Sequence, residues 1–184
     1  MKSQIRVRGM RSLLPLAAAL ALTSCKPMGT QVKQYSGDGT LRTCSKLIGQ
    51  GYAIEFAPFD ATKPYLASYR LSHVPQVHRD PVVYLRFHSG PSVSFPEDLR
   101  TRGTAAIWVS LADTYGREQH SLDLPLSSAV WTESQGLFSA YAPEQSQFHF
   151  EPEEGYVLTV SYKPGDVPPP AANLYFEIDD CAHH

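Results

Sequence analysis

The residues of this chain that could do chemistry are its histidines, cysteines and carboxylates, and their spacing decides whether they form a reactive site. The 184-residue sequence has seven histidines and three cysteines. It contains no Gly-x-Ser-x-Gly nucleophile elbow, no His-Glu-x-x-His zinc helix, and no glycine-rich loop of the kind that cradles a phosphate or a dinucleotide. The sequence therefore predicts a protein that is not an enzyme and that binds no cofactor.

Three groups of side chains offer the donor atoms that metal ions prefer, which are imidazole nitrogens, thiolates and carboxylate oxygens. They are the tail 179–184 with the sequence DDCAHH, the pair His73 and His78, and the acidic residues Glu151, Glu153 and Glu154. The tail places adjacent histidines at a chain end, and the acidic run lacks the alternating Asp and Asn of calcium loops. We therefore predict no metal site and expect solvated surface groups in all three places.

One cysteine follows a pattern with a specific meaning. Cys25 ends the sequence Leu22-Thr23-Ser24-Cys25, which comes after a basic start and the apolar run 13–22. A basic start, a short apolar run and small residues at the exit are the parts of a secretory signal. With the cysteine directly after them, these residues resemble the lipobox of bacterial lipoproteins. The resemblance implies a thioether-linked lipid on Cys25, cleavage before it, and acylation of the new amino terminus.

The lipobox resemblance also implies a location. The apolar run 13–22 is shorter than the roughly 20 residues that a transmembrane helix needs. Two or more acyl chains hold a protein stably at a membrane, whereas one chain holds it only marginally. In lipoproteins an aspartate after the cysteine retains the protein in the inner membrane, so Lys26 favours the outer membrane. The alternative is an ordinary signal peptide, residues 1–24, that happens to be followed by a cysteine.

The other two cysteines gain a meaning from the same resemblance. If lipid occupies Cys25, then Cys44 and Cys181 remain, and the bacterial periplasm is an oxidising compartment. A Cys44–Cys181 disulfide is the expected result, and it would join the start of the folded domain to its end. Two free buried thiols are the alternative. A disulfide would leave no thiol for nucleophilic catalysis.

The charge of the mature chain excludes one class of partner. The leader 1–24 holds four basic and no acidic residues, so 12 of the 16 basic residues remain against all 18 acidic ones. The mature chain therefore has a formal charge of −6. Nucleic-acid binding requires a basic face, so we expect no nucleic-acid partner.

The pattern of apolar residues predicts the fold. Residues 25–43 are polar and contain glycine, which is typical of a flexible tether. From about residue 50 the apolar residues alternate with polar ones, as in 83–87, 107–111 and 156–162. Alternation with a period of two indicates strands with one buried face. Many such strands, separated by proline and glycine turns, predict an all-β, antiparallel β-sandwich over residues 44–184.

The segment 148–162, FHFEPEEGYVLTVSY, carries a second resemblance. An acidic corner, a Gly-Tyr pair and an alternating strand resemble the tyrosine corner of immunoglobulin-like β-sandwiches. The resemblance implies that Tyr156 holds the corner position and that its hydroxyl bonds to the backbone upstream. An ordinary hairpin turn is the alternative. Neither Cys44 nor Cys181 lies where antibody domains have their inter-sheet pair, so the resemblance concerns architecture.

A binding surface is predicted from aromatic residues at strand positions that alternate with the core positions and therefore lie on the outer faces of the sheets. These rings are Tyr84, Trp108, Tyr141 and Tyr175. Exposed aromatic rings can stack on sugars or anchor a protein partner. The loop 163–172 contains Pro168, Pro169 and Pro170, and a stiff proline-rich loop loses little entropy on binding. The alternatives are that loops or an extra strand cover the rings, and that the loop is a rigid spacer.

These features together predict a non-catalytic outer-membrane lipoprotein whose immunoglobulin-like sandwich binds a protein or a surface polysaccharide in the cell envelope. One alternative is an immunity or inhibitor lipoprotein that neutralises a toxin or hydrolase, since its acidic charge would suit a basic target. A more distant alternative is an envelope enzyme acting on glycans, which would need two carboxyl groups about 5 to 10 Å apart across a cleft.

Replacing Cys25 by alanine should abolish incorporation of radiolabelled palmitate, because this thiol is the attachment point that the lipobox resemblance implies. The label would be followed by autoradiography of the membrane fraction. Cys181→Ser is the matched control, since it removes a cysteine outside the lipobox, and it should keep the label. Equal labelling of the two variants would rule out lipid on Cys25.

Overall fold

The computed structural model describes residues 35–45, 50–75, 81–88, 103–134, 136–142, 148–151, 154–167 and 173–181. Its strands are β1 (Ser36–Gly37), β2 (Thr40–Ser45), β3 (Gln50–Glu55), β4 (Phe59–Asp60), β5 (Tyr65–Ser72), β6 (Val82–His88), β7 (Ala106–Asp113), β8 (Glu118–Pro125), β9 (Val130–Ser134), β10 (Leu137–Tyr141), β11 (Gly155–Lys163) and β12 (Asn173–Asp179). A short 3-10 turn, η2 (Leu126–Ser128), follows β8. Within the described ranges, no helix has the length and apolar content that a membrane crossing would require.

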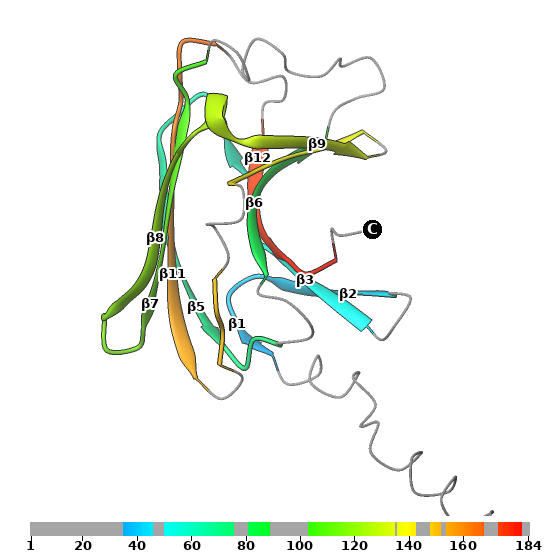
Figure 1. Cartoon of the computed structure of the whole chain (residues 1–184), viewed down its shortest axis with the longest axis vertical. Helices are drawn as coiled ribbons and strands as arrows, with labels where there is room; N and C mark the ends of the chain where they lie inside the picture. The colour runs from blue at the N-terminus through cyan, green and yellow to red at the C-terminus, as the bar shows by residue number, and fades with distance from the viewer. Residues whose placement is uncertain are drawn as a thin grey trace, which may run out of the picture.

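Two antiparallel sheets lie face to face (Figure 1). The smaller sheet has the strand order β1-β5-β11-β7-β8. The larger sheet has the order β2-β3-β12-β6-β10-β9, and β4 also pairs with β12. The predicted all-β, antiparallel β-sandwich is therefore confirmed.

The strands pair in a nested order along the chain, so that each pair encloses the one before it. Strand β7 pairs with β8, β6 with β10, β5 with β11, and β3 with β12. A chain paired in this way is one long hairpin, with its tip at β7–β8, rolled up into two sheets. This is the jelly-roll arrangement of a β-sandwich. The strand order of immunoglobulin domains is different, so the immunoglobulin resemblance extends to the architecture and not to the connections.

Alternating side chains build the core between the sheets. Along β11, Tyr156, Leu158, Val160 and Tyr162 are buried, whereas Val157, Thr159 and Ser161 are half-exposed. Aromatic rings fill the space at one end, where Phe59 stacks on Tyr65 at 4.1 Å and lies near Phe176 at 5.6 Å between ring centroids. Strand β6 departs from the pattern, because Val82–Phe87 are buried on both faces of the sheet. The outer face of the larger sheet is therefore closed at its centre.

The hydroxyl of Tyr156 returns to the backbone upstream of its own strand. It accepts a hydrogen bond of 2.6 Å from the backbone N–H of Glu151, and its side chain is almost completely buried. The Tyr156 ring meets Phe150 edge to face at 5.1 Å. This contact ties the segment before β11 to the strand, which is the arrangement of a tyrosine corner.

The folded domain begins before residue 44, so the predicted tether 25–43 is too long at its C-terminal end. Strand β1 pairs with β5 in the smaller sheet, and β2 pairs with β3 in the larger one. Gly37 and Gly39 make the tight crossing between them at φ 140° and 97°. A Cβ on Gly37 would lie 2.3 Å from the Arg70 carbonyl oxygen, so only glycine fits there. The sequence suggested a flexible coil because the same glycines that permit this crossing are common in linkers.

A Cys44–Cys181 disulfide is present, as predicted. Cys44 lies in β2, which pairs with β3, and Cys181 follows the end of β12. Because β3 and β12 are the outermost pair of the rolled hairpin, the disulfide closes the end at which the hairpin would open. Its two cysteines are 137 residues apart, so it constrains almost the whole domain.

Reduction of this disulfide should lower the free energy of unfolding by up to about 4 to 5 kcal/mol, because it releases a loop of well over 100 residues in the unfolded chain. Urea unfolding with and without reductant measures the change. A Cys44→Ser/Cys181→Ser variant serves as the control, since reductant should not alter its unfolding curve. Alkylation of both thiols of the folded wild type without reductant would show that the bond does not form.

Candidate functional site

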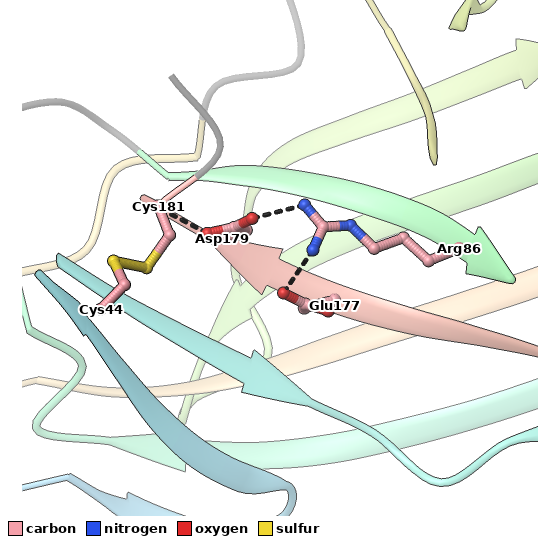
Figure 2. The surroundings of a disulfide bond; sticks show 5 residues. All are labelled: Cys44, Arg86, Glu177, Asp179 and Cys181. Carbon is pink, nitrogen blue, oxygen red and sulfur yellow. Dashed lines mark hydrogen bonds and ion pairs between the residues drawn. A yellow bond between two sulfur atoms is a disulfide. The ribbon is translucent and has the colours of Figure 1, made fainter. Parts of the chain in front are cut away.

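Three charged side chains form a buried cluster on the outer face of the larger sheet (Figure 2). Arg86 comes from β6, and Glu177 and Asp179 come from the neighbouring strand β12. The Arg86 guanidinium donates to Glu177 Oε1 at 2.7 Å and, through its other terminal nitrogen, to Asp179. No more than 8% of any of the three side chains is exposed. Buried charges need partners of this kind, because an unpaired one would be far more costly.

The charged cluster is joined to the disulfide through Asp179. The second oxygen of its carboxylate accepts a hydrogen bond from the backbone N–H of Cys181 (Figure 2). One side chain therefore connects the centre of the sheet to the residue that closes its end. Breaking a buried ion pair by removing one partner typically costs about 3 to 5 kcal/mol, so the cluster matters to stability.

Burial shifts the pKa values of Glu177 and Arg86 in this cluster. It raises the pKa of Glu177 above the ordinary value of 4.5, and the neighbouring Arg86 offsets this only in part. Burial lowers the pKa of Arg86, but the carboxylates of Glu177 and Asp179 outweigh it, and the net pKa is raised. The guanidinium also lies 4.4 Å from the centroid of the Tyr84 ring, and burial raises the pKa of that phenol. Arg86 is therefore a permanent cation held between two carboxylates and a ring.

This arrangement serves structure better than catalysis. Glu177 and Asp179 lie two residues apart on one strand and share a single guanidinium. Glycoside hydrolysis requires two carboxyl groups that face each other across an open cleft. These two are buried and both bonded to Arg86, so they do not form such a pair. The Nε of Arg86 is buried and has no hydrogen-bond partner in the part of the chain that the structure describes.

The four rings predicted to form one binding surface lie on two opposite faces of the sandwich. Tyr84, Tyr141 and Tyr175 project from the outer face of the larger sheet, on the side of the charged cluster. Trp108 projects from β7 on the outer face of the smaller sheet. A single ligand cannot contact both faces at once, so these residues do not make one surface.

Tyr84 and Tyr175 do not belong to an exposed binding surface, because both rings are covered, which is the alternative stated for them above. Only 2% of Tyr84 and 7% of Tyr175 are exposed. The larger sheet is curved, and its edge strands β2 and β9 bend away from the smaller sheet (Figure 1). Side chains on the inside of such a curve converge: Tyr84 meets Tyr141 at 5.0 Å between ring centroids, and Tyr175 stacks on His88 at 5.9 Å. Alternation places a ring on a face of the sheet but does not say whether that face is covered.

Trp108 is in a different environment. It is half-exposed, and its neighbours on the same face are small. Ser161 and Asp123 lie opposite it on the adjacent strands β11 and β8, and Ala106 and Ser110 flank it along β7. The indole is therefore half-exposed with small side chains as its nearest neighbours, on a face where Leu66 is 71% exposed.

Several predicted residues lie outside the described ranges. They are Cys25, the loop residues Pro168, Pro169 and Pro170, and His78, Glu153, His183 and His184 from the groups of possible metal ligands. Among the described residues, no three His, Cys, Asp or Glu side chains are grouped so that they could hold a metal ion.

Comparison with known proteins gives one match. No protein-family model matches the sequence, and no curated protein matches it. Among solved structures, the chain is similar to that of Caldicellulosiruptor saccharolyticus CBM27-1 in complex with mannohexaose, with a TM-score of 0.36 and 9% identity over 85% of this chain and 86% of that one. A likeness of that size says nothing about the ligand of this chain.

Sequence reasoning missed the charged cluster. Arg86 lies among apolar residues in β6, and Glu177 and Asp179 lie among apolar residues in β12. Opposite charges in two strongly apolar strands are a signal that the strands pair. The signal was ambiguous, because alternation also predicted these residues to be on a solvent-exposed face.

Glu177→Gln should change how stability depends on pH. Because the pKa of Glu177 is raised on folding, the folded state holds this proton more tightly than the unfolded state does. The contribution of Glu177 to stability is therefore complete below pH 4.5, and it is lost as the pH rises through the raised pKa of Glu177 in the folded state. Urea unfolding from about pH 4 to 8 should show wild-type stability falling relative to that of Glu177→Gln. Glu154→Gln, which removes an exposed carboxylate, should follow the wild type. If the difference in free energy of unfolding between wild type and Glu177→Gln were the same at every pH, the raised pKa of Glu177 would be contradicted.

Proposed function

We propose that this protein is a non-catalytic, lipid-anchored binding module of the bacterial envelope, and that it binds a protein or surface polymer through the outer face of the smaller sheet. The observation that supports the proposal most strongly is the position of Trp108. Trp108 lies half-exposed among short side chains, whereas Tyr84 and Tyr175 are buried and the half-exposed Tyr141 packs against Tyr84. Large aromatic side chains dominate the energetics of binding surfaces, so an accessible tryptophan is the best candidate for an anchor.

The rest of this face suits a broad contact. Strands β5, β11, β7 and β8 lie side by side, and their outward side chains include Ser68, Thr159, Ser161, Ser121 and Asp123. These side chains are short and polar, and each is exposed or half-exposed. A long ligand could therefore lie against several strands without displacing a bulky residue.

Lipid on Cys25 would keep this face close to a membrane. The described domain begins at Tyr35, ten residues after Cys25. A chain of that length reaches at most about 35 Å even when fully extended. A module on so short a connection would meet ligands of the envelope surface rather than ligands far from it.

Trp108→Ala should reduce binding to isolated envelope material at least tenfold, because it removes the largest accessible contact on the face. The detergent-solubilised full chain would be mixed with envelope fractions, and its depletion from solution measured. Tyr115→Ala is the matched control, since Tyr115 is an aromatic residue 86% exposed at the tip of the β7–β8 hairpin and lies outside the face. Equal binding by both variants and the wild type would refute the proposed face.

A further inference from the structure

We infer that the ligand of the Trp108 face is an uncharged polysaccharide whose chain runs across the strands of the smaller sheet. The inference rests on the proposed function and names the class of ligand. It depends on how the strand register aligns the outward side chains of β5, β11, β7 and β8 into rows.

The first row contains Leu66, Ser161, Trp108 and Asp123, one residue from each strand. Apolar and polar side chains alternate along it. Neighbouring strands are about 4.8 Å apart, so Leu66 and Trp108 are separated by two spacings, or about 10 Å. One strand spacing is close to the length of one pyranose ring. A sugar chain lying along this row could place alternate rings on Trp108 and Leu66.

The second row lies beside the first and consists only of hydroxyl side chains. It contains Ser68, Thr159, Ser110 and Ser121 in direct register on the same four strands. Ser68 and Thr159 bond each other at 3.0 Å, and Ser110 and Ser121 both donate to Glu118. A hydroxyl has one donor and two acceptor positions, so those in the exposed part of this row can take further bonds. Sugar hydroxyls at the edge of a chain on the first row would meet this second row.

The carboxylates at the two rows and the overall negative charge favour a neutral ligand over an anionic one. Asp123 ends the first row, and Glu118, in register with Ala112, accepts hydrogen bonds from Ser110 and Ser121 of the second row. The mature chain carries a formal charge of −6, which would also repel an anionic polymer. The same face also has two cations: Lys163, paired with Ala106, lies in the row next to the first, and Arg70, paired with Val157, lies in the row next to the second.

The small apolar surface around Trp108 and Leu66 favours a polysaccharide over a protein as the ligand. Strong protein interfaces centre on clusters of large aromatic or arginine side chains that become fully desolvated. Here the large apolar side chains Trp108 and Leu66 are separated by Ser161 and stand beside a row of hydroxyls, and the smaller Val157 lies beyond that row. Isolated apolar contacts with many hydroxyls between them match the alternating CH faces and hydroxyl groups of a sugar chain.

Affinity electrophoresis tests the inference with the full chain in native gels containing hydroxyethylcellulose, glucomannan or the anionic polymer alginate. At least one neutral polymer should retard the wild type, and alginate should not. Trp108→Ala should lose at least tenfold in affinity, whereas Tyr115→Ala should match the wild type. Urea midpoints would confirm that each variant is folded.

Oligosaccharides of the bound polymer test the direction of the chain. Affinity should rise with length up to about four sugars, because the row spans four strands. Leu66→Ala should weaken binding of the tetrasaccharide severalfold and leave binding of the disaccharide unchanged. Equal effects on both lengths would overturn the proposed orientation.

Two failures can be told apart. If no neutral polymer retards the wild type, or alginate does so equally, the inference is wrong. Should Trp108→Ala nevertheless reduce binding to envelope material, the proposed face stands and its partner is a protein or a charged polymer. If Trp108→Ala changes neither measurement, both the inference and the proposed function are refuted.

Discussion

The pairing of β12 with both β3 and β6 is the interaction on which the rest of the structure depends. It brings the last strand of the chain into the middle of the larger sheet, between strands from the first half of the domain. One face of β12 supplies Phe176 and Ile178 to the core. The other face presents Glu177 and Asp179, which Arg86 of β6 neutralises. The Cys44–Cys181 disulfide then holds the end of this strand against β2.

The two outer faces of the sandwich have different properties for this reason. On the larger sheet, the ion pairs of Arg86 and converging rings close the centre of the face. On the smaller sheet, short side chains leave Trp108 and Leu66 accessible. The larger sheet, whose outer face is covered at its centre, supports the smaller sheet from behind. This makes a suitable scaffold for binding, because a preorganised face loses little conformational entropy when a ligand binds. The position of the proposed binding face is thus a consequence of how the other face is stabilised.

Much of the fold could be predicted from local patterns, and the candidate site only in part. Alternation identified strands such as β7 and β11 and placed Trp108 outside the core. The same reasoning placed Tyr84 and Tyr175 outside the core between the sheets, which is correct, but it could not decide whether they are exposed, and they are buried. It also took the glycines near residue 37 for a tether, although they allow the chain to cross between the two sheets. In each case, a local property could not decide a question about neighbours distant in the sequence.

The sequence by itself determined the strand class, the excess of acidic over basic residues and, through its cysteines, the expectation of the disulfide. These depend on the two-residue period of a strand, on composition and on residue identity, which need no knowledge of the fold. Only the tertiary structure decided the jelly-roll order, the charged cluster and which outer face is open. Those depend on which strands become neighbours and how a sheet bends. Both are set by packing of the whole chain, so no short segment of sequence specifies them.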